Sequence, residues 1–187
     1  MSDNGFLRIA AFTIDSNTGT LTSAGTVPAG NNPLGLAVHS SGKFLYVSDW
    51  NSGTGNVLAY SIDGSSGALN PIVGSPFAAG PQPVDVALDP SGKFAYVALV
   101  GGPSLAGFTV DSTAGALVAT AGYPFPADNP TEIAVDSSGK FLYITNQALN
   151  TVGAYTLNTK TGALSAVPGA PFASGTGPVG LAVAVTQ

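Results

Sequence analysis

The sequence contains no cysteine and few charged residues. Without cysteine, the chain can form neither disulfides nor thiolate metal sites. Only 8% of the residues are charged, and ten Asp and Glu against five Lys and Arg give a net charge of −5. This acidic balance argues against nucleic acid as a partner, because binding phosphates requires a clustered basic surface. It also opposes binding to an anionic membrane surface.

Long apolar runs are missing as well. No stretch approaches the roughly 18 apolar residues of a transmembrane helix, so we expect no membrane span. The start of the chain, MSDNGFLRIAAF, lacks the charged region followed by an apolar region that marks a signal peptide. The scarcity of charge and the abundance of Ser, Thr, Gly and Ala favour an extracellular or periplasmic protein, and a cytoplasmic location stays open.

What the sequence does contain is a fourfold internal repeat with a period of 47 to 50 residues. The first phrase is PLGLAVHS, PVDVALDP, PTEIAVDS or PVGLAVAV, and the second is SGKFLYVSDW, SGKFAYVALV or SGKFLYITNQ. The third is IAAFTIDSNTGTL, VLAYSIDGSSGAL, LAGFTVDSTAGAL or VGAYTLNTKTGAL, and the fourth is GSPF, GYPF or GAPF. The 25 glycines and 14 prolines lie mostly between the apolar segments, which is typical of short strands joined by turns.

Each phrase predicts one β-strand, and we label the four strands A, B, C and D in chain order. In the second phrase both faces are apolar, so strand B should be buried on both sides. Four short strands in about 48 residues predict an all-β fold, a β-propeller of four-stranded antiparallel blades. A sandwich of meanders is the alternative, although it does not require so regular a period. We expect one domain, divided into a partial blade at 1–32, repeats at 33–82, 83–129 and 130–177, and a terminal strand at 178–187.

These phrases resemble the lactonase-type propeller family, which includes bacterial 6-phosphogluconolactonases and the YVTN-repeat proteins. The resemblance is carried by DPSGKFAYVA at 89–98, DSSGKFLYITN at 136–146 and AYSIDGSSGAL at 59–69, and it covers nearly the whole chain. It implies blades of this family, with about seven in full-length relatives against about four here. It also implies basic residues, often His, just after the proline that opens strand A. Here those positions hold Gly35, Asp85, Glu132 and Gly180, so the catalytic set of the family cannot be carried over.

The terminal blade is incomplete, because the chain begins with a stub of strand B and has no copy of SGKFLY after the last strand A. An open propeller would expose apolar blade faces and unpaired strand edges. The repeats could close a small ring alone, two chains could complete a ring of about eight blades, or the chain could be part of a longer protein. We favour self-association as a homo-oligomer, since radial repeats need neighbours to cover their faces.

The candidate site lies where strand A begins. Asp85 and Glu132 hold the same position in successive repeats, so we expect them side by side at the mouth of the central channel. Asp49, Trp50 and Asn146 follow strand B and should lie on the same rim. Such carboxylates could carry out acid–base chemistry or hold Ca²⁺, although solvated rim carboxylates are the simpler interpretation. The only histidine, His39, falls in a turn, so we do not expect it to be catalytic.

From sparse ionisable residues and an incomplete strand set, we expect a propeller module for binding or self-assembly, without catalysis and without a cofactor. The alternative is a lactonase-like hydrolase, similar to 6-phosphogluconolactonase, that acts on a sugar lactone at the channel mouth. In that case the residues involved would be Asp85, Glu132, Asp49 and Asn146, with Asp85 and Glu132 as the catalytic candidates.

Overall fold

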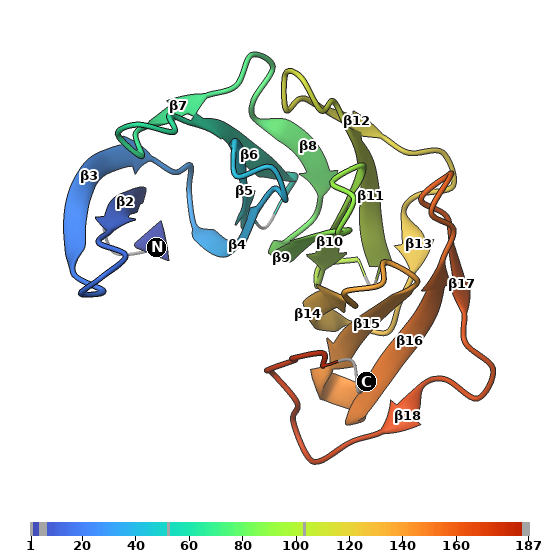
Figure 1. Ribbon diagram of the computed structural model, residues 1–187. Helices are drawn as coiled ribbons and strands as arrows, with labels where there is room; N and C mark the ends of the chain where they lie inside the picture. The colour runs from blue at the N-terminus through green and yellow to red at the C-terminus, as the bar shows by residue number, and fades with distance from the viewer. Residues whose placement is uncertain (1, 4–6, 52, 103, 185–187) are drawn as a thin grey trace.

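The computed structural model describes residues 2–3, 7–51, 53–102 and 104–184, and these form four antiparallel β-sheets. The sheets follow one another along an open arc (Figure 1). Three of them are complete blades in the order A, B, C, D, as the repeat predicts. The fourth, at the N-terminal end of the arc, has three strands. The all-β propeller architecture expected from the sequence is therefore confirmed.

The complete blades share one strand order, and strand C pairs with both halves of strand D. The N-terminal sheet contains β1 (Ser2–Asp3), β2 (Arg8–Ile14) and β3 (Leu21–Pro28). The blades contain β4 (Pro33–Val38), β5 (Phe44–Asp49), β6 (Gly55–Ile62), β7 (Leu69–Pro71) and β8 (Phe77–Gly80); β9 (Pro83–Leu88), β10 (Phe94–Leu99), β11 (Ser104–Val110), β12 (Leu117–Ala119) and β13 (Phe125–Pro126); and β14 (Pro130–Val135), β15 (Phe141–Asn146), β16 (Thr151–Leu157), β17 (Leu164–Ala166) and β18 (Phe172–Ala173), with a 3-10 turn at Gln147–Leu149.

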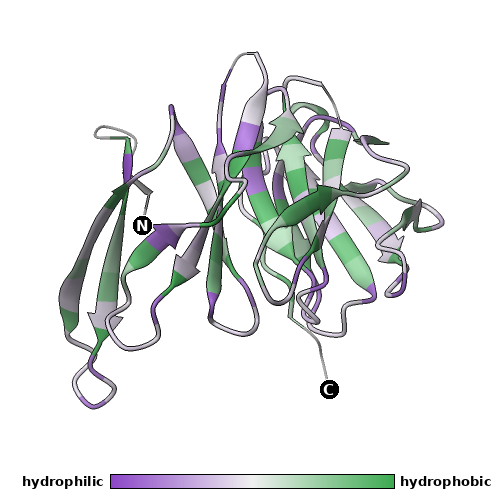
Figure 2. Ribbon diagram, turned by 90° about the horizontal axis from the view of Figure 1, so that it is seen from above, coloured by the Kyte–Doolittle hydropathy of each residue, from purple (hydrophilic) through white to green (hydrophobic). Residues whose placement is uncertain are grey.

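In the first two complete blades, strand B packs against neighbouring blades on both of its faces. Every residue of β5 and of β10 is buried, which agrees with the two apolar faces of the second phrase. Phe44 and Tyr46 join a core with the blade that follows, while Leu45 and Val47 join a core with the sheet that precedes. Hydrophobic residues accordingly concentrate in the strands (Figure 2). The cores of this fold thus lie between blades, and each blade depends on its neighbours.

Strand D differs from the expected single segment in the complete blades. Leu69–Pro71 and Phe77–Gly80 both pair with β6, and the chain leaves the sheet between them. Gly74, with φ of +91°, lies in this excursion. The end of the third phrase, from its final leucine onward, therefore forms the first half of strand D, and the fourth phrase forms only the second half.

Aspartates at repeated positions stabilise the turns. Asp63 accepts hydrogen bonds from the backbone N–H groups of Ser65 and Ser66 between strands C and D. Asp89 accepts one of 2.7 Å from the N–H of Phe94 between strands A and B. His39 replaces Asp89 in its own repeat, and its Nε2 lies 3.0 Å from the carbonyl oxygen of Gly92 in the next blade. The histidine is buried and structural.

The last predicted strand A is not paired. Residues 178–184 have irregular backbone, and residues 185–187 lie outside the described part of the chain. The physical reason is the lack of a neighbour, because a strand needs a partner for its backbone N–H and C=O groups and none of the described strands pairs with this segment. Within the described ranges no helix has the length and hydrophobicity required to cross a membrane.

Candidate active site at the channel mouth

The inner side of the arc is formed by the A strands β4, β9 and β14, which lie next to one another (Figure 1). Gly35, Asp85 and Glu132 occupy equivalent positions on these strands, and Gly180 follows in the segment 178–184. Asp85 pairs with Ala98, and Glu132 pairs with Thr145, near the ends of β10 and β15. The predicted acidic residues therefore share the end of the channel at which strand A begins.

Asp85 is the most strongly perturbed carboxyl of this group. Its Oδ2 accepts a hydrogen bond of 3.1 Å from the backbone N–H of Ile133 on the neighbouring blade. Burial is the main cause that raises the pKa of the Asp85 carboxyl to about 6, and the negative charge of Glu132 contributes in the same direction. The hydrogen bonds from the N–H groups of Ile133 and Val86 act in the opposite direction. Asp85 can therefore exchange a proton near neutral pH.

Gly35 lies directly against Asp85, where a larger residue would not fit. A Cβ atom at position 35 would lie 2.7 Å from Cα of Asp85 and would also overlap its carboxylate. The N–H of Gly35 donates a hydrogen bond of 2.8 Å to Oγ of Ser48, which holds this part of β4 in place. The glycine is thus required for the close approach of β4 to β9, and it keeps one side of Asp85 free of side chains.

Glu132 lies on the other side of Asp85 and is half-buried. Its Oε2 would lie 3.9 Å from a Cβ atom at Gly180, which is ordinary van der Waals distance. The mouth therefore has glycine positions at both ends and carboxylates in the middle. This arrangement can orient a polar ligand that approaches along the channel axis.

Asp49 is on the same rim, but it performs a different task. It is buried, and its Oδ1 accepts hydrogen bonds of 2.7 and 2.8 Å from the N–H groups of Asn31 and Asn32. A Cβ atom at Gly30 would overlap the Asp49 carboxylate. Asp49 therefore fixes the connection between the N-terminal sheet and β4, and it does not join Asp85 and Glu132.

Asn146 occupies the repeat position of Asp49 without an equivalent partner. It is buried, and its Nδ2 donates a hydrogen bond of 3.0 Å to Oγ1 of Thr151. Its Oδ1 is buried and has no hydrogen-bond partner. A buried acceptor without a donor costs free energy, so this atom could accept a hydrogen bond from a bound molecule.

Trp50 directly follows β5 and is half-buried. Its backbone N–H donates a hydrogen bond of 2.9 Å to the carbonyl of Asn32, so it lies on the rim, as the repeat predicts.

Asp85 and Glu132 supply only part of the ligand set that a calcium site requires. Calcium binds six to eight oxygen atoms. Asp85 and Glu132 are neighbours, yet no group of three His, Cys, Asp or Glu residues suited to a metal occurs among the residues that the structure describes. Calcium binding stays a prediction that rests on these two carboxylates.

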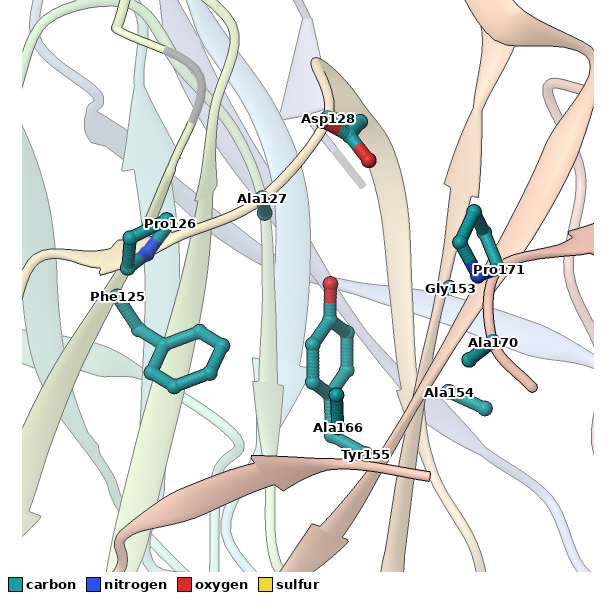
Figure 3. A pocket seen from close by; sticks show the side chains of 10 residues that line it. All are labelled: Phe125, Pro126, Ala127, Asp128, Gly153, Ala154, Tyr155, Ala166, Ala170 and Pro171. Atoms are coloured by element: carbon teal, nitrogen blue, oxygen red, sulfur yellow. The ribbon is translucent and has the colours of Figure 1, made fainter. Parts of the chain in front are cut away.

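A pocket between the last two blades was not expected from the sequence. It has a volume of about 510 Å³, and its walls include Phe125, Asp128, Gly153 and Ala170. The hydroxyl of Tyr155 points toward the side where Asp128 lies (Figure 3). Burial raises the pKa of Tyr155, and the charge of Asp128 adds to this.

An equivalent pocket of about 420 Å³ lies between the preceding two blades, and Tyr123 forms part of its wall. In the preceding blade the ring of Tyr123 covers Gly107, where a Cβ atom would lie 2.5 Å from that ring. The equivalent of Tyr123 in the last blade is Ala170, whose methyl group cannot fill the same space. The phrases GYPF and GAPF differ at this position, and both border a pocket between blades.

Comparison with known proteins places these blades in a family. The family model described as lactonase, seven-bladed β-propeller, matches residues 2–98 and 71–179. Comparison with curated proteins gave no match.

Solved structures with the same fold include lactonases. A candidate 6-phosphogluconolactonase from Bacteroides uniformis superimposes with a TM-score of 0.80 at 25% identity, over 95% of this chain and 51% of that one. A candidate 6-phosphogluconolactonase from Bacteroides fragilis gives 0.77 at 25% identity, over 92% and 51%. The periplasmic gluconolactonase of Pseudomonas aeruginosa gives 0.66 at 17% identity over 86% and 48%, and shows the fold alone. This chain spans about half the length of these structures, and it belongs to the lactonase family of seven-bladed β-propellers.

Proposed function

We propose that this protein hydrolyses a sugar lactone at the channel mouth, with Asp85 as the acid–base group. The observation that carries the proposal is the Asp85 carboxyl, whose pKa is raised to about 6 and whose position is fixed by the N–H of Ile133. The family match and the structural similarity to two candidate 6-phosphogluconolactonases support the same reaction class.

Lactone hydrolysis needs a base that can later act as an acid. The Asp85 carboxylate would accept a proton from water as the water oxygen attacks the carbonyl carbon of the lactone. The ring C–O bond then breaks, and the departing ring oxygen takes the proton from Asp85. One water is consumed, one hydroxy acid forms, and Asp85 returns to its starting state. A pKa near 6 suits both steps at neutral pH, because neither protonation state is rare.

The charges at the mouth favour an uncharged lactone over a phosphorylated one. Asp85 and Glu132 are both acidic, whereas Lys43, Lys93 and Lys140 belong to the A-to-B turns at the opposite end of the blades. A phosphate group beside two carboxylates would be repelled. The sugar hydroxyls of an uncharged lactone can instead donate hydrogen bonds to the carboxylate of Glu132.

The sequence led us to expect a module without catalysis, because the basic residues of the family are replaced at the start of strand A. The family match supports the hydrolase better. The raised pKa of Asp85 also supplies an acid–base group that composition could not indicate.

The experiment compares hydrolysis of glucono-δ-lactone with that of its 6-phosphate, after subtraction of the spontaneous rates. We expect the wild-type protein to hydrolyse the uncharged lactone faster, and Asp85→Asn to lower kcat/KM at least about 100-fold. The matched control is Asp128→Asn, which removes an exposed carboxylate from a D-to-A connection on the same rim and should keep activity within about twofold. Equal activity of wild type and Asp85→Asn would refute the role of Asp85, and no turnover of either lactone would refute the proposed reaction.

A further inference from the structure

One contact joins neighbouring blades, and it is repeated along the chain. The hydroxyl of Tyr46 on β5 donates a hydrogen bond of 2.8 Å to the carbonyl of Gly115, in the C-to-D turn of the next blade. The hydroxyl of Tyr96 on β10 donates one of 3.0 Å to the carbonyl of Gly162, again in the next C-to-D turn. We call the strand-B half of this contact the tyrosine side and the turn half the glycine side.

A phenylalanine two residues before each tyrosine completes the tyrosine side. A Cβ atom at Gly115 would lie 2.6 Å from Cδ1 of Phe44, and one at Gly162 would lie 2.5 Å from Cδ1 of Phe94. Gly115 and Gly162 both have φ above +70°. Only glycine fits this position, first because of the ring packed on it and second because of its left-handed backbone.

The last blade presents a tyrosine side with no glycine side opposite it among the described residues. Phe141 and Tyr143 on β15 hold the positions of Phe44 and Tyr46. Phe141 is 36% exposed, whereas Phe44 is 5% exposed. Tyr143 is half-buried, whereas Tyr46 is fully buried. The last blade therefore has the side chains for the contact that the first two complete blades make, but these side chains are not covered.

The N-terminal sheet presents the missing glycine side. The N–H of Gly19 donates a hydrogen bond of 2.8 Å to the carbonyl of Asp15, as Gly115 does to Asp111 at 2.7 Å. The turn is thus already formed, with φ of +71° at Gly19. A Cβ atom at Gly19 would meet no atom within 4 Å, in contrast to Gly115 and Gly162.

Exposed apolar side chains surround this empty turn. Phe12, Ile14 and Leu21 hold the repeat positions of Phe108, Val110 and Leu117. Ile14 is 70% exposed and Phe12 and Leu21 are also exposed, while Phe108 and Leu117 are buried in the core with Phe44 and Tyr46. Phe12, Ile14 and Leu21 also line an open hollow of about 420 Å³ with residues of the next blade, among them Leu45 and Leu69, and they remain exposed there. The space over Gly19 is empty, and the apolar side chains beside it are only partly covered.

We propose that the tyrosine side of the last blade binds the glycine side of a second copy of this chain. The two open surfaces are the two halves of one contact, and they belong to the first and last sheets of the arc (Figure 1). In the bound pair the hydroxyl of Tyr143 donates to the carbonyl of Gly19 of the second copy, and the ring of Phe141 packs over that glycine. The contact is head to tail, so it can close into a ring or extend further.

The first test is the mass of the 187-residue chain by light scattering over a range of concentrations. We expect a mass above the 18.4 kDa of one chain that falls on dilution.

Tyr143→Phe should weaken association about tenfold, since it removes one hydrogen bond. Tyr96→Phe makes the same change inside the chain and should leave association unchanged. A chain of single-copy mass at every concentration overturns the proposal and leaves these surfaces to another partner.

Glycine substitutions test the other half of the contact. Gly19→Ala should weaken association more than about tenfold, because the methyl group would occupy the place of the Phe141 ring. The control is Gly122→Ala, since Gly122 also has a positive φ and open space around it but lies in the excursion of strand D. Equal effects of the two substitutions would show that backbone strain alone is responsible, and would overturn the assignment of Gly19.

Cross-linking tests the head-to-tail geometry, and the absence of cysteine makes it selective. Thr18→Cys places a thiol beside Gly19, and Lys140→Cys places one beside Phe141. With a short bismaleimide, we expect a mixture of the two single variants to form a cross-linked dimer in much higher yield than either variant alone. Dimers that form equally well in the separate variants would contradict the proposal, because they would indicate a symmetric contact.

Discussion

Asp49 and Asp85 are acidic residues at the same end of neighbouring blades, yet their surroundings give them different tasks. Asp49 accepts two backbone hydrogen bonds and fixes a connection. Asp85 lies beside Glu132 in a partly buried position, where its pKa is raised to about 6. Repeat position alone predicted that both lie on the rim. It could not predict the difference, which depends on the loop that packs on each side chain.

The raised pKa of Asp85 predicts a pH-dependent cost in stability. The folded-state pKa lies above the unfolded value, so stability is fully present below pH 4 and is lost as pH rises through 6. Asp85→Asn should match the wild type near pH 4 and be more stable by about 1–3 kcal/mol at pH 7. Urea unfolding at both pH values measures this. The pKa of Asp63 is lowered by hydrogen bonds from Ser65 and Ser66. Its contribution to the pH dependence is the same in both proteins, so it cancels in the difference.

A stability difference between the two proteins that does not change between pH 4 and pH 7 would contradict this prediction.

Gly35 and Gly180 offer a matched pair of substitutions at the two ends of the mouth. Gly35→Ala should destabilise the protein by about 1–3 kcal/mol and abolish lactone turnover, because the new methyl group would lie 2.7 Å from Cα of Asp85. Gly180→Ala should change neither property, since its methyl group would lie 3.9 Å from Glu132. Thermal unfolding and lactone assays measure both effects. Similar results for the two variants would show that Gly35 does not position Asp85.

Among the elements, strand B and the C-to-D turn hold the blades together. The phrase KFLY was expected to be buried on both faces, and β5 confirms it. The sequence did not indicate that the hydroxyls of Tyr46 and Tyr96 donate hydrogen bonds to the next blade. In a buried strand, a tyrosine is normally interpreted as an aromatic packing residue. The position of the next blade is needed to identify the acceptor.

Tyr46→Phe and Tyr96→Phe remove the same hydroxyl from two equivalent positions. The Gly115 carbonyl has Tyr46 as its side-chain donor, whereas the Gly162 carbonyl also accepts a 2.8 Å hydrogen bond from Tyr123. Tyr46→Phe should therefore cost about 1–2 kcal/mol of stability, and Tyr96→Phe should cost less. Urea unfolding midpoints compare the two. A larger loss for Tyr96→Phe would contradict the proposed role of Tyr123.

Strand D shows where pattern reading fails. The fourth phrase led us to expect one strand, but β7 and β8 are separate segments that pair with different ends of β6. The residues of β7 are few, and alternation cannot be recognised over so short a stretch. The pairing is set by the long strand C, because both segments form hydrogen bonds with the same edge of that strand. Whether these residues form one strand or two therefore depends on how they pair with strand C, which the sequence pattern does not show.

At the scale of the whole molecule, the repeat was sufficient to predict the propeller, because blades repeat both their apolar pattern and their turns. It also predicted that Asp85 and Glu132 meet at the channel mouth, since equivalent positions on successive A strands are neighbours. It did not predict the pocket beside Tyr155, which lies between two blades and is lined by residues far apart in the sequence. Nor could it show that the open ends of the arc carry the two halves of one contact.

The pH dependence of lactone turnover tests the central claim most directly. For glucono-δ-lactone, kcat/KM of the wild-type protein should rise with pH to a plateau, with a midpoint near pH 6 set by Asp85. Asp85→Asn should lose both the activity and this midpoint, while Asp128→Asn should retain them. A wild-type profile without a transition near pH 6, or a transition that survives in Asp85→Asn, would contradict the assignment of Asp85 as the acid–base group.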